Sequence, residues 1–131
     1  MKQRRSLLLS FLMMLSMAGC STVKEGPHRT QVDSSRIELA ASLENRIQIE
    51  GILARRFTDR LQAQVILKNI GNDAAHVQTR FMWFSSTGAP LDDSTAIWEG
   101  WVLKPGEDRT ITGTAGSAKA SDFRLSIQPH E

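Results

Sequence analysis

Residues 61–69, "LQAQVILKN", and residues 76–85, "HVQTRFMWFS", decide the fold of this chain. In the first stretch apolar and polar residues alternate, with Ile66 as the exception on the polar side. The second stretch repeats the pattern and places four residues on one face: Val77, Thr79, Phe81 and Trp83. A period of two is typical of half-buried strands. Because the short polar turn "IGND" separates the stretches, we predict that they form an antiparallel pair.

Strand patterns continue towards the C-terminus. Three further segments read as strands: 96–103 "AIWEGWVL", 109–114 "RTITGT" and 123–128 "FRLSIQ". Pro105 and Gly106 suit the two central positions of a type II turn. Asn69, at the end of its strand, is expected to cap the following turn with its side-chain amide. Residues 85–93 and 115–122 are rich in small and polar side chains and are predicted to be loops.

The region from Arg36 to Arg60 gives a weaker signal. Residues 36–46 contain many helix formers, whereas residues 46–53, "RIQIEGIL", alternate like a strand. We predict two strands here, with a short helix as the alternative. About seven short strands separated by turn signals indicate an all-β fold, a small antiparallel β-sandwich of immunoglobulin-like architecture.

The first nineteen residues have the layout of a secretory signal peptide. Lys2, Arg4 and Arg5 precede an uncharged apolar run that ends in small residues before Cys20. The run is about a dozen residues long, too short for the roughly 20 that a membrane-spanning helix needs. We therefore predict a cleaved signal over 1–19, a flexible tether over 20–35 and one β-sandwich domain over 36–131.

Met17, Ala18, Gly19 and Cys20 resemble the lipobox of bacterial lipoproteins. The resemblance implies cleavage between Gly19 and Cys20, a diacylglycerol on the Cys20 sulfur and an N-acyl chain on its freed amine. Two or more acyl chains anchor a protein stably, whereas one binds reversibly. By resemblance to lipoprotein sorting in Gram-negative bacteria, Ser21 directs the protein to the outer membrane, with its domain facing the periplasm.

The stretch from Val65 to Gln128 resembles the YcfL-like family of short bacterial outer-membrane lipoproteins. The likeness rests on four segments and Trp98 between the second and third: "VILKN" (65–69), "TRFMWFSSTGAPL" (79–91), "LKPGE" (103–107) and "AGSAKASDFRLSI" (115–127). Two positions depart from the family pattern, Ser85 where Asp is frequent and Gly116 where Pro is frequent. The resemblance implies a periplasmic lipoprotein with a β-sandwich domain, in a family without an established activity.

Charge and composition argue against several functions. The chain has 16 Lys and Arg and 14 Asp and Glu, and without the three basic residues of the signal the balance becomes 13 to 14. This balance gives no basic surface of the kind that binds nucleic acid.

The three histidines, His28, His76 and His130, share no metal-ligand spacing. Asp92 and Asp93 lack the alternation of a calcium loop and are expected in a solvated turn. We predict no enzymatic activity, no metal and no cofactor besides the covalent lipid.

Four residues are candidate contacts to a partner. Trp98 and Trp101 lie three apart, so in a regular strand they face opposite ways and one would be an exposed aromatic group. Arg55 and Arg56 belong to the densest basic cluster.

We predict a non-enzymatic binding or accessory module for another cell-envelope protein. The alternatives are a glycan or small-ligand binder that uses a tryptophan and the Asp92–Asp93 loop, and an inhibitor of a foreign enzyme such as lysozyme.

Overall fold

The computed structural model describes residues 34–131, which form seven strands and two short 3-10 turns. The turns are η1 (Ser34–Arg36) and η2 (Ala41–Leu43). The strands are β1 (Ile37–Leu39), β2 (Ile47–Phe57), β3 (Arg60–Asn69), β4 (Ala75–Phe84), β5 (Glu99–Leu103), β6 (Asp108–Thr114) and β7 (Asp122–Pro129). The predicted all-β class with seven strands is confirmed. In the weak region from 36 to 60 there are two strands, as expected, with a 3-10 turn between them.

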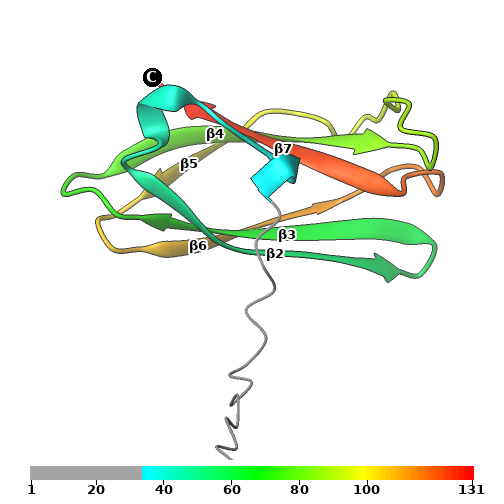
Figure 1. Ribbon diagram of the computed structural model, residues 1–131, viewed down its shortest axis with the longest axis horizontal. Coiled ribbons are helices and arrows are strands. Elements are labelled where there is room, and N and C mark those ends of the chain that lie inside the picture. Colours follow the sequence, from blue (N-terminus) through cyan, green and yellow to red (C-terminus); the bar gives the residue numbers. More distant parts are fainter. Residues whose placement is uncertain (1–33) are drawn as a thin grey trace, which may run out of the picture.

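The strands form two sheets that face each other (Figure 1). One sheet has the order β1-β7-β4-β5 and the other the order β2-β3-β6. Only β1 and β7 run parallel, and every other pair is antiparallel. The chain changes sheet four times: between β1 and β2, between β3 and β4, between β5 and β6, and between β6 and β7. This is a β-sandwich of immunoglobulin-like architecture in which the N-terminal strand β1 completes the edge beside the C-terminal strand β7.

The predicted pairing of residues 61–69 with residues 76–85 is wrong. The two strands, β3 and β4, lie in different sheets: β3 pairs with β2 and β6, and β4 with β5 and β7. The turn between them crosses from one sheet to the other instead of closing a hairpin. The alternation predicts correctly which face of each strand is buried, but it carries no information on which neighbour supplies the hydrogen bonds.

The core lies where the two inner faces meet. Its largest part comes from β3 and β4, whose inward side chains are buried throughout: Leu61, Ala63, Val65, Leu67, Ala75, Val77, Phe81 and Trp83. The ring of Trp83 is 1% exposed and stacks on Phe81 at 5.5 Å between ring centroids. Phe123 of β7 packs against both rings, at 6.0 and 6.4 Å. These three rings form one aromatic cluster within the core.

Asn69 joins two turns at one end of the sandwich. Its buried side-chain amide donates hydrogen bonds to the carbonyls of Asp73 (2.8 Å) and Leu103 (2.9 Å), and its Oδ1 accepts from the Gly71 N–H (2.9 Å). Its own carbonyl accepts from the N–H of Gly106, at 2.8 Å. Gly106 has a φ of +76°, as the third position of a type II turn requires. The predicted roles of Asn69 and of the Pro105–Gly106 turn are confirmed.

Candidate binding surfaces

Trp98 and Trp101 have different environments. Trp98 precedes β5, is 37% exposed and lies under the guanidinium of Arg80, at 4.7 Å from the ring centroid. Trp101 packs against the core, donates from Nε1 to the Thr79 hydroxyl (2.9 Å) and lies beneath Arg109, at 5.5 Å. Trp101 therefore closes the edge of the sandwich between β5 and β6, and Trp98 is the more accessible of the two.

Arg55 and Arg56 point to opposite faces of β2. Arg56 lies opposite Leu61 on the core side, and its Nη2 donates to the Ala120 carbonyl at 3.1 Å. Arg55 is exposed, donates from Nε to the Gln62 Oε1 at 3.0 Å and lies 5.9 Å from the centroid of the Phe57 ring. Arg56 therefore ties β2 to the loop before β7, while Arg55 remains on the outer surface. The partner-contact role of these arginines and of the two tryptophans stays a prediction.

A β-bulge in β2 creates an exposed apolar patch. The register with β3 shifts between Ile49 and Gly51, so Glu50 is the extra residue. Beyond the bulge Ile52 faces the core opposite Val65, and the side chains that alternate with it turn outward. Leu53 is 56% exposed, Phe57 is 59% exposed, and Ile66 of β3, opposite Gly51, lies on the same outer face. We call Leu53, Arg55, Phe57 and Ile66 the β2 patch.

Sequence reasoning missed the β2 patch, although it contained one signal. Ile66 breaks the alternation of β3, and an apolar residue on the polar face of a strand indicates an apolar surface there. The bulge was not predicted, because a period of two that continues from Ile47 and Ile49 puts Leu53 and Phe57 on the inner face. A register that shifts at Glu50 is what moves Leu53 and Phe57 from the expected inner face to the outer one.

A cleft of about 230 Å³ opens between the two sheets on the side of β6. Its walls come from β4, from β6 and from the segment that leads into β5: Thr79, Phe81, Trp83, Thr95, Ile97, Glu99, Ile111, Thr112, Gly113 and Thr114. Gly113 is essential to this arrangement, because a Cβ there would lie 2.3 Å from a ring carbon of Phe81. The cleft combines hydroxyl groups, apolar side chains and one carboxylate.

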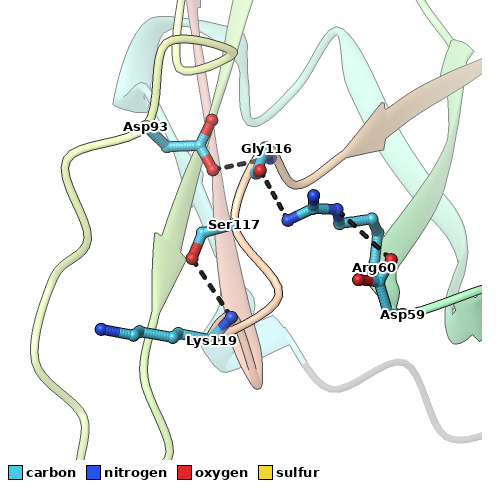
Figure 2. A network of polar contacts seen from close by, with 6 residues as sticks. All are labelled: Asp59, Arg60, Asp93, Gly116, Ser117 and Lys119. Carbon is cyan, nitrogen blue, oxygen red and sulfur yellow. Dashed lines mark hydrogen bonds and ion pairs between the residues drawn. The ribbon is translucent and has the colours of Figure 1, made fainter.

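Asp93 is buried, which corrects the expectation of a solvated turn. One carboxylate oxygen accepts from the N–H (2.9 Å) and the hydroxyl (2.6 Å) of Thr95, and the other accepts from the Gly116 N–H (2.8 Å). Figure 2 shows Asp93 pointing at Gly116, whose carbonyl in turn accepts from Arg60 at 2.8 Å. Asp93 therefore fastens the loop before β5 to the loop before β7. Its oxygens are engaged by the protein, while Asp92 beside it is exposed.

Burial raises the pKa of Asp93, but hydrogen bonds from the side chain and backbone of Thr95 and from the backbone of Gly116 and Ser117 lower it. Together the hydrogen bonds outweigh the effect of burial, so the pKa of Asp93 lies below its ordinary value of 3.8. The carboxylate is therefore charged at neutral pH and stabilises the fold in that form.

Three of the predicted site residues, Gly19, Cys20 and Ser21, lie outside the residues that the structure describes. Among residues 34–131, no three His, Cys, Asp or Glu side chains are grouped so that they could hold a metal ion. The same part of the chain contains no helix long and apolar enough to cross a membrane.

Comparison with known proteins identifies the family. A family model described as "Protein of unknown function (DUF1425)" matches residues 30–129, about three quarters of the chain. The chain belongs to the DUF1425 family. No curated protein matches it.

Two crystal structures resemble the DUF1425 chain described here. A DUF1425 family member from Shewanella sp. pv-4 is 16% identical with a TM-score of 0.60, over 65% of this chain and 79% of that one. Campylobacter jejuni cj0090 is 21% identical with a TM-score of 0.63, over 72% of this chain and 98% of that one. At such identities the likeness shows a shared fold alone.

In this DUF1425 chain we expect Asp93→Ala to lower the free energy of unfolding at pH 7 by about 2–3 kcal/mol, because it leaves the N–H groups of Thr95 and Gly116 without partners. Since the pKa of Asp93 is lowered by folding, its contribution is complete above pH 3.8 and is lost as the pH falls below that value. Urea denaturation at pH 7 and pH 3 should therefore show a difference between wild type and variant that shrinks in acid. Asp92→Ala, at the exposed neighbour, is the control, and an equal loss in both variants would contradict the prediction.

Proposed function

We propose that this protein is a lipid-anchored module of the outer membrane that faces the periplasm and binds another cell-envelope protein without catalysing a reaction. The signal-like residues 1–19, the lipobox-like residues before Cys20, and Ser21 support the anchor and its destination. The resemblance of residues 65–128 to the YcfL-like lipoproteins supports the same setting within the DUF1425 family. Binding of a partner rests on one structural observation, the open edge and exposed patch of β2.

β2 is an unusual edge strand. It is 11 residues long and lies at the outside of its three-stranded sheet, so one row of its backbone N–H and C=O groups has no neighbouring strand among residues 34–131. Natural proteins usually protect such edges with short strands, charges or proline, because an open edge pairs readily with other chains. The edge of β2 has a bulge at Glu50 and two arginines, but it also carries exposed Leu53 and Phe57. An open edge beside apolar side chains is the arrangement by which many domains bind an extended segment as an added strand.

The charges of the β2 patch indicate the chemistry of the partner. Arg55 contacts Gln62 and the Phe57 ring, and among residues 34–131 it forms no ion pair. Arg60 lies beside the patch at the start of β3. An extended segment with alternating apolar and acidic side chains would cover Leu53 and Phe57 and would neutralise Arg55. An anchor close to the domain would raise the effective concentration of such a partner near the membrane.

In-cell crosslinking of the full chain tests this proposal. A photoreactive residue at position 53 or 57 should capture the same envelope protein, whereas one at Val102, also apolar and 50% exposed but in the other sheet, should not. Leu53→Asp should reduce capture from position 57 by about tenfold, because it puts a charge into an apolar contact, and Val102→Asp should leave it unchanged.

The anchor is tested in the same cells. Cys20→Ala should abolish incorporation of labelled fatty acid, release the protein from the outer membrane and lower capture from position 57. Equal capture from positions 53, 57 and 102 would refute the binding surface. Full retention of the Cys20→Ala protein in the outer membrane would refute the lipid anchor.

A further inference from the structure

The cleft between the sheets is independent of the β2 patch, since β6 and β2 form opposite edges of the three-stranded sheet. Its size limits what it can hold. At about 230 Å³ it is smaller than the roughly 300 Å³ at which sites for drug-sized ligands begin, so it fits a group of the size of one amino-acid side chain. β6 forms one wall and is an edge strand, and in the part of the chain that the structure describes no strand pairs with its outer backbone groups.

The walls of the cleft are held in place by hydrogen bonds. The hydroxyl of Thr79 accepts from Trp101 Nε1 at 2.9 Å. The hydroxyl of Thr95 donates to Asp93 at 2.6 Å and accepts from Trp83 Nε1 at 3.1 Å. The hydroxyl groups of Thr79 and Thr95 are therefore held by Trp101 and Asp93, which do not line the cleft, and by Trp83, which does. A cleft that is formed before a ligand arrives avoids the entropic cost of ordering its walls upon binding.

Glu99 gives the cleft its charge. It is the only ionisable side chain among the residues that line the cleft, and it is exposed. Within residues 34–131 its carboxylate forms no ion pair and no hydrogen bond with another side chain. Ile97 beside it is an exposed apolar wall, and Ile111 lies at the base. The ligand that complements this arrangement has one cationic head on a short apolar stem.

We propose that the cleft binds the basic side chain of a lysine or arginine in an extended peptide that lies along β6. The apolar stem of that side chain would pack on Ile97 and Ile111, and the cationic head would pair with Glu99 and the nearby hydroxyl groups. Pairing of the peptide backbone with the open edge of β6 would direct every second side chain to the inner side, where the cleft opens.

Chemical-shift titration of the purified full chain in detergent tests this site. Three of the probes are blocked tripeptides: Val-Lys-Val, Val-Nle-Val and Val-Glu-Val. Norleucine (Nle) has an apolar side chain without the ammonium group of lysine. The fourth probe is butylamine, a cation without a peptide backbone. The Val-Lys-Val peptide should shift amide signals of Thr95, Ile97, Glu99 and residues 111–114. It should bind about tenfold more tightly than the norleucine peptide, in line with a charge-assisted contact, and more tightly than butylamine.

Glu99→Gln should weaken binding of the lysine peptide by about tenfold, because it removes the charge and retains the shape. Asp108→Asn is the matched control, since Asp108 is an exposed acid of β6 that does not line the cleft. Equal affinity for the lysine and norleucine peptides, equal losses in the two variants, or shifts confined to residues outside the cleft would each overturn the proposal. Equal affinity for butylamine and the lysine peptide would overturn pairing with β6. None of these results depends on the β2 patch.

Discussion

Replacing Trp83 by alanine is expected to lower the free energy of unfolding by about 3–5 kcal/mol, the usual cost of removing a large aromatic side chain from a core. The Trp83 ring is 1% exposed and contacts Phe81 and Phe123, so little in its surroundings can collapse into the space that it leaves. The free energy of unfolding of a domain of about 100 residues is only about 5–15 kcal/mol, so the variant should be only marginally stable at 37 °C.

Trp98→Ala is the matched control for this experiment. Trp98 is the same residue type, but its ring is 37% exposed and contacts the guanidinium of Arg80 on the surface. We expect a loss of about 1 kcal/mol or less. Urea denaturation followed by far-UV circular dichroism compares the variants without relying on tryptophan fluorescence. Similar losses of unfolding free energy in both variants would show that Trp83 does not stabilise the core more than an exposed tryptophan does.

Gly113→Ala is expected to cost about 3 kcal/mol, at the upper end of the usual range for overpacked sites. The added Cβ would lie 2.3, 2.7 and 2.8 Å from three ring carbons of Phe81. Phe81 is buried and stacked on Trp83, so its ring cannot withdraw without displacing a second large side chain. The cost therefore arises from strain in the aromatic cluster and not from the propensity of alanine for strands.

A smaller partner should relieve this strain. In the double variant Gly113→Ala with Phe81→Leu, the total loss should be less than the sum of the two single losses, because the branched side chain leaves room for the Cβ. Gly100→Ala is the control, since its Cβ would come no closer than 3.4 Å to His130. Thermal unfolding of the four proteins measures the coupling. Strictly additive losses, or a Gly113→Ala protein as stable as Gly100→Ala, would contradict the clash.

The sequence predicts local properties of this fold well. The alternation in residues 61–69 and 76–85 identifies the buried faces of β3 and β4, and the turns at Asn69 and Gly106 follow from side-chain chemistry within a few residues. The strand count and the sandwich class follow from the spacing of such local signals. Each of these properties depends on neighbours along the chain.

The properties that the sequence does not predict depend on distant neighbours. β3 and β4 are separated by a short turn and nevertheless belong to different sheets. Asp93 becomes buried because the N–H of Gly116, 23 residues away, reaches its carboxylate. The β2 patch depends on a bulge at Glu50 that is defined only by the register with β3. Such long-range contacts leave no periodic pattern in the sequence. A single sequence can therefore indicate which residues are important, but it does not show which of them contact one another.

The parallel pair of β1 and β7 has a consequence for the order of folding. Ile37 of β1 pairs with Leu125 of β7, so this edge of the four-stranded sheet joins the first and last strands of residues 34–131. Contacts between residues so far apart in sequence close large loops and form late. In a chain that a signal peptide over residues 1–19 exports from its N-terminus, this sheet would be complete only after β7 had crossed the inner membrane. Until residues 122–129 had crossed, β1 would lie without its neighbour.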